Sequence, residues 1–379
     1  MDLICFCHIR WNFVYQRPQH LLSRFAKSYR VFYIEEPVFI DENNPYCNIS
    51  LISEHLWVVV PNLPRNLSEE EIISTQQSLL TQLFTSHKIN NYFFWYYTPM
   101  ALTISRHFTP KFIVYDCMDE LSNFKFAPPS LKDLEKELFN KADIVFTGGY
   151  NLYLAKKDSH HNIYPFPSSI DKEHFIQARN KMDDPKDQAT IPHPRFGFYG
   201  VIDERFDLQL LAEVAMRKPE WQFIIIGPVI KIDPVSLPQL SNIHYPGSKT
   251  YNDLPAYLSG WDIAMIPFVI NESTRYISPT KTPEYLAGGK PVISTSIKDV
   301  VESYGINSLV HIADNADEFI QAAEKELNTN DKEKWLTSVD SFLSGNSWDK
   351  TWNQMMKLIE NTTRENNNIT NNLNKEAYV

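Results

Sequence analysis

The stretch Arg195–Pro228, "RFGFYGVIDERFDLQLLAEVAMRKPEWQFIIIGP", decides the fold of the second half of the chain. It opens with the apolar run "RFGFYG" and closes with the apolar run "QFIIIGP", and both have the length and composition of a buried strand. Between them, "FDLQLLAEVAMRKP" carries its apolar residues at helical spacing. A strand, a helix and a strand in this order are typical of a parallel α/β sheet.

The same alternation of strands and helices runs through most of the chain. In the first half, "LICFCHI" and "RVFYIEEP" are predicted as strands on either side of the helix "RPQHLLSRFAKSY". A polar, proline-punctuated stretch after Phe175 has no periodicity and predicts a linker. We therefore expect two doubly wound, Rossmann-like α/β domains. The expected bounds are 1–175 for the N-terminal domain, 176–194 for the linker, 195–345 for the C-terminal domain, 346–360 for a helix that returns to the N-terminal domain, and 361–379 for an Asn-rich disordered tail.

The composition favours a soluble protein that does not bind nucleic acid. The 379 residues are 43% hydrophobic, which is enough for two packed cores, and their formal net charge is −10. An acidic balance argues against binding to nucleic-acid phosphates. No signal-peptide pattern opens the sequence and no apolar run of about 18 residues occurs, so we expect a cytoplasmic protein.

The four cysteines, Cys5, Cys7, Cys47 and Cys117, predict free thiols rather than a metal centre. Cys5 and Cys7 alternate within a predicted strand and therefore share one of its faces. No second Cys/His pair stands at zinc spacing, which makes buried thiols in a reducing compartment the better interpretation.

Residues just after the predicted strands are the candidates for ligand binding, because open α/β sheets bind ligands beyond the carboxyl ends of their strands. Gly200 follows the first strand of the C-terminal domain and lets the backbone approach a ligand closely. Arg205 either clamps a phosphate, which we favour, or pairs with Glu204 or Asp207 on a solvated face. Tyr251 lies in a later loop of the same kind, after the predicted strand "IHYPG".

The stretch that begins at Ser278, "SPTKTPEYLAGGKPVIST", places a lysine and a glutamate at the start of an apolar helix. Ser278 or Thr282 can cap this helix, whose first N–H groups would form an anion site. Lys281 adds a positive charge suited to a diphosphate. Phosphate would repel Glu284, whose carboxylate suits the vicinal hydroxyls of a ribose; the alternative is a glutamate that only stabilises the helix dipole. Together with Arg205, these residues favour a nucleotide site.

Several stretches follow the motif pattern of one enzyme family. The segment "SPTKTPEYLAGGKPVIST" is similar to S/N-P-x-K-x-x-E-Y-x-A-x-G-K-P-V, and "FPSSIDKEHF" is similar to P-N-G-V-D-x-x-x-F. The other stretches are "GFYGVIDERFDLQLL" with "WQFIIIGP", "NIHYPGSKTYNDLPAYLSGWDIAMIPF" and, near the start, "WNFVYQRPQHLLSRFA". From Met1 to about Glu360 the chain resembles the GT-B glycosyltransferases, in particular the retaining family 4, or group 1, transferases of bacterial polysaccharide and teichuronic acid synthesis.

This resemblance implies two Rossmann-like domains that face each other across a cleft, with a nucleotide-sugar donor on the C-terminal domain. It further implies that Lys281 and Arg205 hold the donor diphosphate and that Glu284 holds the ribose. Gly200 is expected to lie under the donor.

The sequence departs from the family pattern in two places. Tyr276 stands where the first of two paired glutamates belongs, and Glu272 is the substitute that we expect near the donor sugar. Pro283 falls inside the expected helix, so the helix either begins at Thr282 or has a distorted first turn.

The N-terminal domain is expected to supply the acceptor side of the reaction. Asp116 and Asp119 follow a predicted strand and are candidates for a general base or for binding a sugar hydroxyl; a strand-end turn and a helix cap are the structural alternatives. The aromatic strand "NYFFWYYTP" offers an apolar surface, unless it is a core strand. The basic residues Arg24, Lys27 and Arg30 either contact a phosphate-bearing acceptor and the inner face of the membrane or form a solvated helix face.

We therefore predict a glycosyltransferase that moves a hexose-type sugar from a nucleotide diphosphate, preferably UDP, to a glycan or lipid-linked acceptor in cell-surface polysaccharide synthesis. No metal or other cofactor is expected, because no Asp-x-Asp pair follows a predicted strand and Lys281 with Arg205 can neutralise the diphosphate. A dehydrogenase would need G-x-G-x-x-G after its first strand, and the sequence lacks it there. A sugar-nucleotide 2-epimerase of the same fold and an inactive partner subunit are the alternatives.

Overall fold

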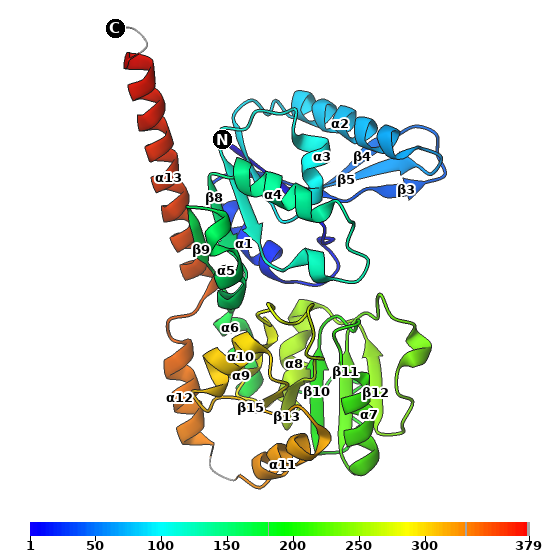
Figure 1. The fold of residues 1–379 in the computed structure, drawn as a ribbon. Helices are drawn as coiled ribbons and strands as arrows, with labels where there is room; N and C mark the ends of the chain where they lie inside the picture. Colours follow the sequence, from blue (N-terminus) through cyan, green and yellow to red (C-terminus); the bar gives the residue numbers. More distant parts are fainter. Residues whose placement is uncertain (181, 330–331, 377–379) are drawn as a thin grey trace. The chain divides into compact units, whose positions relative to one another are not determined.

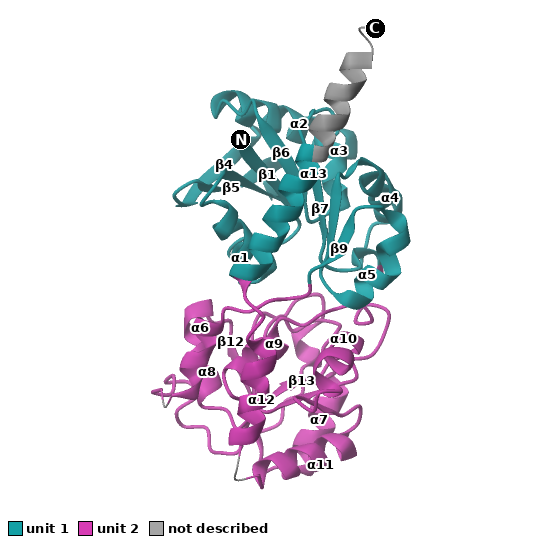
Figure 2. Cartoon of the chain, turned by 90° about the vertical axis from the view of Figure 1, so that its left-hand side faces the viewer, with its two compact units in different colours: residues 1–122, 126–166, 349–379 teal, residues 123–125, 167–348 magenta. Residues whose placement is uncertain are grey.

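The computed structural model describes residues 1–180, 182–329 and 332–376, with side chains up to Arg364. The chain divides into two compact units (Figure 1, Figure 2). Unit 1 comprises residues 1–122, residues 126–166 and the chain from Asp349 onward; unit 2 comprises residues 123–125 and 167–348. Each unit is built on its own largely or wholly parallel sheet with helices, as the sequence pattern predicts.

The described residues of unit 1 form a nine-stranded sheet in the order β3-β5-β2-β1-β6-β7-β8-β9, with β4 paired to β5. The β4–β5 pairing is antiparallel, and the other pairings of these described strands are parallel. The strands are β1 (Asp2–Cys7), β2 (Arg30–Glu35), β3 (Val38–Ile40), β4 (Tyr46–Ser53), β5 (Leu56–Pro64), β6 (Tyr92–Tyr96), β7 (Ile113–Cys117), β8 (Ile144–Thr147) and β9 (Ile163–Pro165).

The helices of unit 1 include the last helix of the chain. They are α1 (Arg17–Phe25), α2 (Glu69–Ser86), α3 (Leu102–Ser105), α4 (Leu131–Lys141), α5 (Tyr150–Lys156) and α13 (Trp348–Glu376). α13 lies in unit 1 from Asp349 onward: Arg24 pairs with Asp349 at 2.9 Å, and the Trp352 ring packs against Phe25. The segment 361–379, expected as a disordered tail, instead continues α13 as far as Glu376, and residues 377–379 lie outside the described chain.

Unit 2 carries a six-stranded sheet in the order β12-β11-β10-β13-β14-β15, and its described pairings are all parallel. The strands are β10 (Arg195–Tyr199), β11 (Gln222–Ile226), β12 (Ile243–Gly247), β13 (Ile263–Ile266), β14 (Val292–Ser294) and β15 (His311–Ile312). The helices are α6 (Lys172–Phe175), α7 (Leu208–Arg217), α8 (Leu254–Ser259), α9 (Lys281–Ala287), α10 (Lys298–Val300), α11 (Ala316–Leu327) and α12 (Glu333–Leu343).

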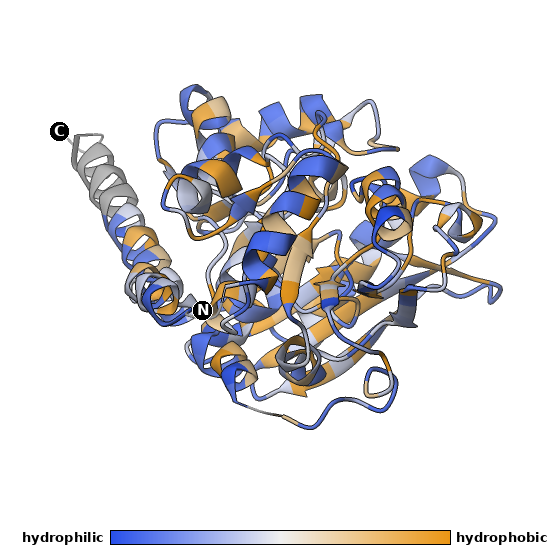
Figure 3. Ribbon diagram, turned by 90° about the horizontal axis from the view of Figure 1, so that it is seen from below, coloured by the Kyte–Doolittle hydropathy of each residue, from blue (hydrophilic) through white to orange (hydrophobic). Residues whose placement is uncertain are grey.

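Apolar residues gather along the strands, and the helices alternate between hydrophobic and hydrophilic residues (Figure 3). This is the pattern of amphipathic helices that cover a buried parallel sheet. Among the described helices, none combines the length and the apolar character needed to cross a membrane.

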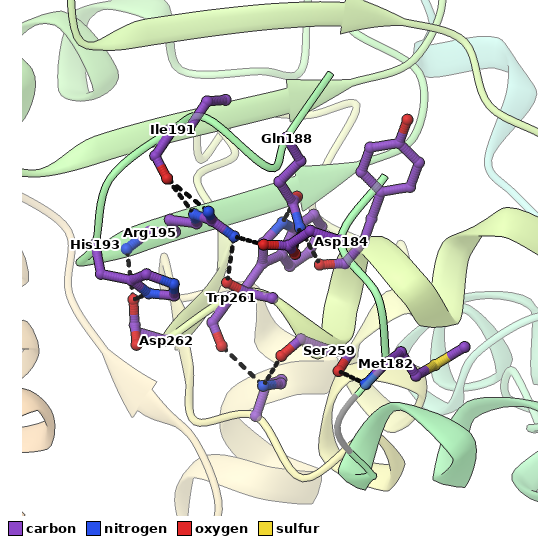
Figure 4. Close-up of polar contacts among 12 residues, drawn as sticks. Met182, Asp184, Gln188, Ile191, His193, Arg195, Ser259, Trp261 and Asp262 are labelled. Carbon is purple, nitrogen blue, oxygen red and sulfur yellow. Dashed lines mark hydrogen bonds and ion pairs between the residues drawn. The ribbon is translucent and has the colours of Figure 1, made fainter. Parts of the chain in front are cut away.

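The segment 176–194 is not the linker that the sequence predicts, because it packs within unit 2 (Figure 4). Gln188 is fully buried, donates to the Tyr257 carbonyl and accepts a hydrogen bond from the Trp261 indole N–H at 2.9 Å. Asp184 pairs with the buried Arg195 at 2.7 Å. The polar side chains that suggest a loop therefore serve as hydrogen-bond partners for the core of unit 2.

Candidate functional site

The carboxyl edge of the unit 2 sheet is built around two glycines with positive φ. Gly200 follows β10 and Gly227 follows the neighbouring β11; both have φ of +143°, a conformation that favours glycine. A Cβ atom on Gly227 would lie 1.8 Å from the Gly200 carbonyl oxygen, so the two turns leave no room for a side chain there. A Cβ atom on Gly200 would lie 2.6 Å from Nζ of Lys281, so the glycine lets this ammonium group approach the end of β10.

Helix α9 presents Lys281 as its first residue, and its N-terminus differs from the expected one. The N-cap residue is Thr280, and its side chain makes no capping hydrogen bond. Ser278 and Thr282 were the predicted caps, and this prediction is wrong: the Ser278 carbonyl accepts from Ser168 Oγ at 2.9 Å, and Thr282 is a fully buried helical residue. The positive charge at this edge therefore comes from a side chain, since α9 is short and uncapped.

Pro283 does not distort α9. The helix begins at Lys281, one residue earlier than the sequence suggests, so Pro283 occupies its third position. The N–H groups of the first turn have no partner inside a helix, and a proline there costs no hydrogen bond.

Glu284 lies in the same helix and is buried beside two tyrosines. The Tyr199 hydroxyl donates to Oε2 of Glu284 at 2.8 Å, and the Tyr285 hydroxyl accepts from the backbone N–H of Tyr199 at 3.0 Å. Burial raises the pKa of Glu284 to about 7, although the Tyr199 hydrogen bond and the charge of Lys281 act in the opposite direction. Near neutral pH this carboxyl group is therefore poised between its ionised and protonated forms.

Arg205 is held by a carboxylate that the sequence analysis did not consider. Its guanidinium bonds both oxygens of the buried Asp203, at 2.7 and 2.9 Å. Asp207, one of the two predicted partners, instead caps α7 by accepting from the Leu210 N–H at 2.8 Å. Arg205 lies near the end of β10, as expected, but its charge is partly neutralised in place.

The other two predicted donor contacts lie in different settings. Tyr251 stacks on the imidazole ring of His174, with ring centroids 4.2 Å apart, so one face of the tyrosine is covered. Glu272 lines a cavity of ≈ 720 Å³ together with Arg275. Lys281 lies against Gly200 and shares α9 with Glu284, and neither Lys281 nor Glu284 lines the cavity of Glu272.

In unit 1, Asp116 is sealed in a buried ion pair. It is fully buried, and Arg17 bonds both of its oxygens, with Nη2 to Oδ1 at 2.7 Å and Nε to Oδ2 at 2.9 Å. Nη1 of Arg17 also donates to the Phe166 carbonyl at 2.6 Å. This buried ion pair favours a structural role for Asp116 over the predicted role as a general base. Asp119 follows β7 and is only half-buried.

Two surfaces of unit 1 were predicted to bind an acceptor: the aromatic strand and the basic residues near α1. In the structure, the aromatic strand belongs to the core and most of the basic residues are paired within unit 1. Residues 93–97 of the aromatic stretch are buried core. Arg24 pairs with Asp349, and Arg30 pairs with Asp2 at 2.7 Å, so most of the basic surface is neutralised within unit 1.

The described cysteines are free, and Cys5, Cys7 and Cys117 are buried. Within the described residues, no three His, Cys, Asp or Glu side chains gather in a way that could hold a metal ion.

Comparison with known proteins shows which proteins this chain resembles. Residues 193–329 match the family model described as glycosyl transferases group 1. The chain is similar to the Bacillus subtilis glycosyltransferase TuaH, a protein named for teichuronic acid biosynthesis, with 25% identity over 284 residues that cover 69% of this chain and 70% of that protein. The chain is therefore similar to group 1 glycosyltransferases, and the match to the family model lies within unit 2.

The solved structures of similar shape show that the fold of the chain is GT-B. An Escherichia coli trehalose-6-phosphate structure bound with UDP-2-fluoro glucose has a TM-score of 0.68 at 11% identity and covers 96% of this chain and 99% of its own. Sucrose-phosphate synthase of Thermosynechococcus elongatus has a TM-score of 0.64 at 13% identity, and the match covers 99% of this chain and 100% of that one. The catalytic domain of starch synthase IV from Arabidopsis thaliana, bound to ADP and acarbose, has a TM-score of 0.65 at 12% identity. That match covers 96% of this chain and 99% of the other.

The sequence analysis missed Tyr199 and Asp203. Tyr199 is the last residue of β10, directly before Gly200, so its position after the "FGF" run already placed it at the carboxyl edge. Asp203 is two residues before Arg205 and gave no signal of its own, because a nearby acid and base are as common on a solvated surface as in a site.

Proposed function

We propose that the chain transfers a hexose-type sugar from a nucleotide diphosphate, UDP in the first place, to a glycan or lipid-linked acceptor. One observation carries this proposal: the Lys281 ammonium group lies against Gly200 at the end of β10, three residues before the buried Glu284. A cation and a carboxylate side by side at the carboxyl edge of a parallel sheet suit a ligand with both phosphates and hydroxyls.

Each group of this site would act on a different part of the donor. Lys281 would hold the diphosphate and stabilise the charge that grows on it as the sugar leaves. Glu284, when ionised, would accept hydrogen bonds from the ribose hydroxyls, and Tyr199 would hold the carboxylate in place. The bound UDP-2-fluoro glucose and ADP of the similar structures support a nucleotide diphosphate as the donor class.

Unit 1 would bind the acceptor. Asp119 is the carboxylate of this unit that we propose as the general base or as a hydrogen-bond acceptor for a sugar hydroxyl. The similarity to a Bacillus subtilis protein named for teichuronic acid biosynthesis supports a cell-surface polysaccharide as the product, made at the cytoplasmic face of the membrane. We further propose that transfer retains the anomeric configuration and needs no metal, since Lys281 together with Arg205 can offset the charge of the departing diphosphate.

The purified chain should be incubated with a panel of labelled nucleotide sugars, with and without membrane extract and with and without EDTA. Wild type is expected to transfer or slowly hydrolyse at least one donor in all four conditions. Lys281→Ala is expected to lose both reactions and Asp119→Ala to lose transfer. Lys218→Ala, which removes a lysine paired with Glu324 on the surface, is expected to retain them.

Three results would overturn the proposal. Interconversion of a sugar nucleotide without any acceptor would indicate an epimerase. Absence of both binding and turnover across the panel would indicate an inactive partner subunit. Activity lost in EDTA and restored by manganese would overturn the metal-free mechanism.

A further inference from the structure

Unit 2 contains a polar cavity at the amino edge of its sheet. The cavity measures ≈ 460 Å³, which falls within the roughly 300–1,000 Å³ of small-molecule pockets. Its walls include residues that shortly precede three neighbouring parallel strands: His193 before β10, Gly260 before β13 and Lys290 before β14. These strands begin at the edge opposite the one that carries Lys281 and Glu284. The cavity is therefore separate from the proposed donor site.

Lys290 is a half-buried lysine of this cavity, and its amine is held by two backbone carbonyls (Figure 4). Nζ donates to the carbonyl oxygens of Ser259 and Trp261, at 2.8 Å each. Both carbonyls lie where α8 ends and the chain leads into β13. Unlike Lys156 and Lys218, Lys290 has no carboxylate partner within the described chain. Its charge is thus held by carbonyl groups alone.

These two hydrogen bonds orient the amine for reaction. An ammonium group has three N–H donors, and the carbonyls of Ser259 and Trp261 use two of them. When the third proton leaves, both hydrogen bonds remain and a lone pair takes its place. The carbonyls of α8 and β13 therefore hold the neutral amine of Lys290 as well as they hold the ammonium ion, and they fix the direction of its lone pair.

Burial also favours the neutral amine. It lowers the pKa of Lys290 from 10.5 to about 8. The charges of Asp262 and Asp184 act in the opposite direction, and that of Lys332 acts in the same direction as burial. About a tenth of the Lys290 side chains are therefore neutral at pH 7. A desolvated neutral lysine is a nucleophile.

The charged residues of the wall favour an anionic reactant. Arg179 lines the cavity together with Lys290, and its partner Asp340 bonds the guanidinium at 2.8 Å. The one Asp or Glu among the described lining residues is Asp184, and Arg195 neutralises it at 2.7 Å. A small anion that enters the cavity thus meets cations and no unpaired carboxylate.

His193 supplies a proton acceptor on the same wall. Its Nδ1 lies 2.7 Å from Oδ2 of Asp262, and that oxygen also accepts from the backbone N–H of Arg195 at 2.6 Å. Because a carboxylate only accepts, Nδ1 carries the hydrogen and Nε2 is the acceptor of the neutral ring. The cavity therefore holds a nucleophile and a base that can take its proton.

We propose that this cavity is a modification site, in which Lys290 takes the acyl group of a small acyl phosphate. The amine nitrogen forms a bond to the carbonyl carbon, and the bond from that carbon to the phosphate oxygen breaks. Phosphate leaves with the electron pair and takes up the proton that the nitrogen loses, so the products are an amide and inorganic phosphate. The amide keeps one N–H for a carbonyl, whereas a neutral imine formed with an aldehyde would keep none. This inference does not depend on the transferase function.

The test incubates the full wild-type chain with acetyl phosphate at several pH values and measures the rate of acetylation at each lysine by peptide mass spectrometry. Lys132, which is exposed on α4, is the comparison. Lys290 is expected to react about tenfold faster than Lys132 at pH 8, and its rate should level off between pH 8 and pH 10. In concentrated urea, which removes the cavity, the two rates should become equal.

Lys290→Arg is the control variant, because arginine keeps the positive charge and forms no such amide. It should leave the acetylation of Lys132 unchanged. Reaction at Lys290 no faster than at Lys132, a rate that keeps rising up to pH 10, or a difference that persists in urea would each overturn the inference. Faster labelling of Lys290 by glycolaldehyde with borohydride than by acetyl phosphate would overturn the assignment to acyl donors.

Discussion

Arg17–Asp116 in unit 1 and Lys281–Glu284 in unit 2 are two cation–carboxylate sets at the carboxyl edge of a parallel sheet, and they differ in their hydrogen-bond partners. Arg17 bonds both oxygens of Asp116 and a backbone carbonyl as well, so the set is closed on itself. Glu284 is held by the Tyr199 hydroxyl, and Lys281 lies against a glycine. We propose that hydrogen-bond partners, rather than residue types, distinguish the structural pair in unit 1 from the candidate ligand site in unit 2.

The largest effect is expected when the closed pair is broken. Arg17→Ala leaves the Asp116 carboxylate buried without its partner, which typically costs about 3–5 kcal/mol of folding free energy. Denaturant unfolding of wild type and variant measures this loss.

Arg24→Ala is the matched control for this prediction. Arg24 also pairs with a carboxylate, but its partner Asp349 is largely exposed. Exposed pairs contribute about 0–1 kcal/mol. If Arg17→Ala destabilised the protein no more than Arg24→Ala does, the Arg17–Asp116 pair would not be the structural element described above.

Glu284→Gln is expected to stabilise the protein in a pH-dependent way. The folded-state pKa of Glu284 is about 7 and its ordinary value is 4.5, so wild type loses stability as pH rises through this window. Glutamine cannot ionise and avoids that loss. The variant should match wild type at pH 4.5 and exceed it at pH 8 by a margin on the order of 3 kcal/mol.

Thermal unfolding at several pH values measures this difference. Glu135→Gln serves as a comparison, since Glu135 is a buried carboxylate paired with Lys156. That change should destabilise the protein at pH 8. The difference in folding stability between Glu284→Gln and wild type should grow from pH 4.5 to pH 8. A difference that does not grow would contradict the description of Glu284 as a buried carboxyl group with a raised pKa.

The smallest effect is expected for Arg205. Its guanidinium is already held by Asp203, so its removal should weaken UDP binding by only about threefold, in keeping with a partly neutralised cation. Titration calorimetry of Arg205→Ala with UDP measures this. A loss of a hundredfold or more would mean that Arg205, rather than Lys281, is the main diphosphate ligand.

Much of the fold could be predicted from the sequence because its signals are local. The apolar runs of β1, β6, β10 and β11 and the spacing of α7 were sufficient to predict two doubly wound α/β units. The segment 176–194 was misassigned because polar residues look alike in a loop and in a buried network. Gln188 and its partner Trp261 are 73 residues apart, and no local pattern links them.

The candidate site residues also divide into those whose proximity the sequence reveals and those that only the fold brings together. Lys281 and Glu284 are three residues apart on one helix, so their proximity follows from helix geometry. The role of Asp116 depends on Arg17, which lies 99 residues away in the sequence, and only the fold brings the two together. Sequence analysis could therefore place Lys281 and Glu284 on one helix, but it could not foresee the ion pair of Asp116.

The most direct test of the central claim is a titration of UDP and of pyrophosphate into wild type, Lys281→Ala and Glu284→Ala. Lys281→Ala should weaken both ligands by about tenfold or more, because it removes a charged partner of the diphosphate. Glu284→Ala should weaken UDP by about tenfold and leave pyrophosphate unchanged, because the carboxylate serves the ribose alone. Equal losses for both ligands in Glu284→Ala, or unchanged binding of both in Lys281→Ala, would contradict the proposed donor site.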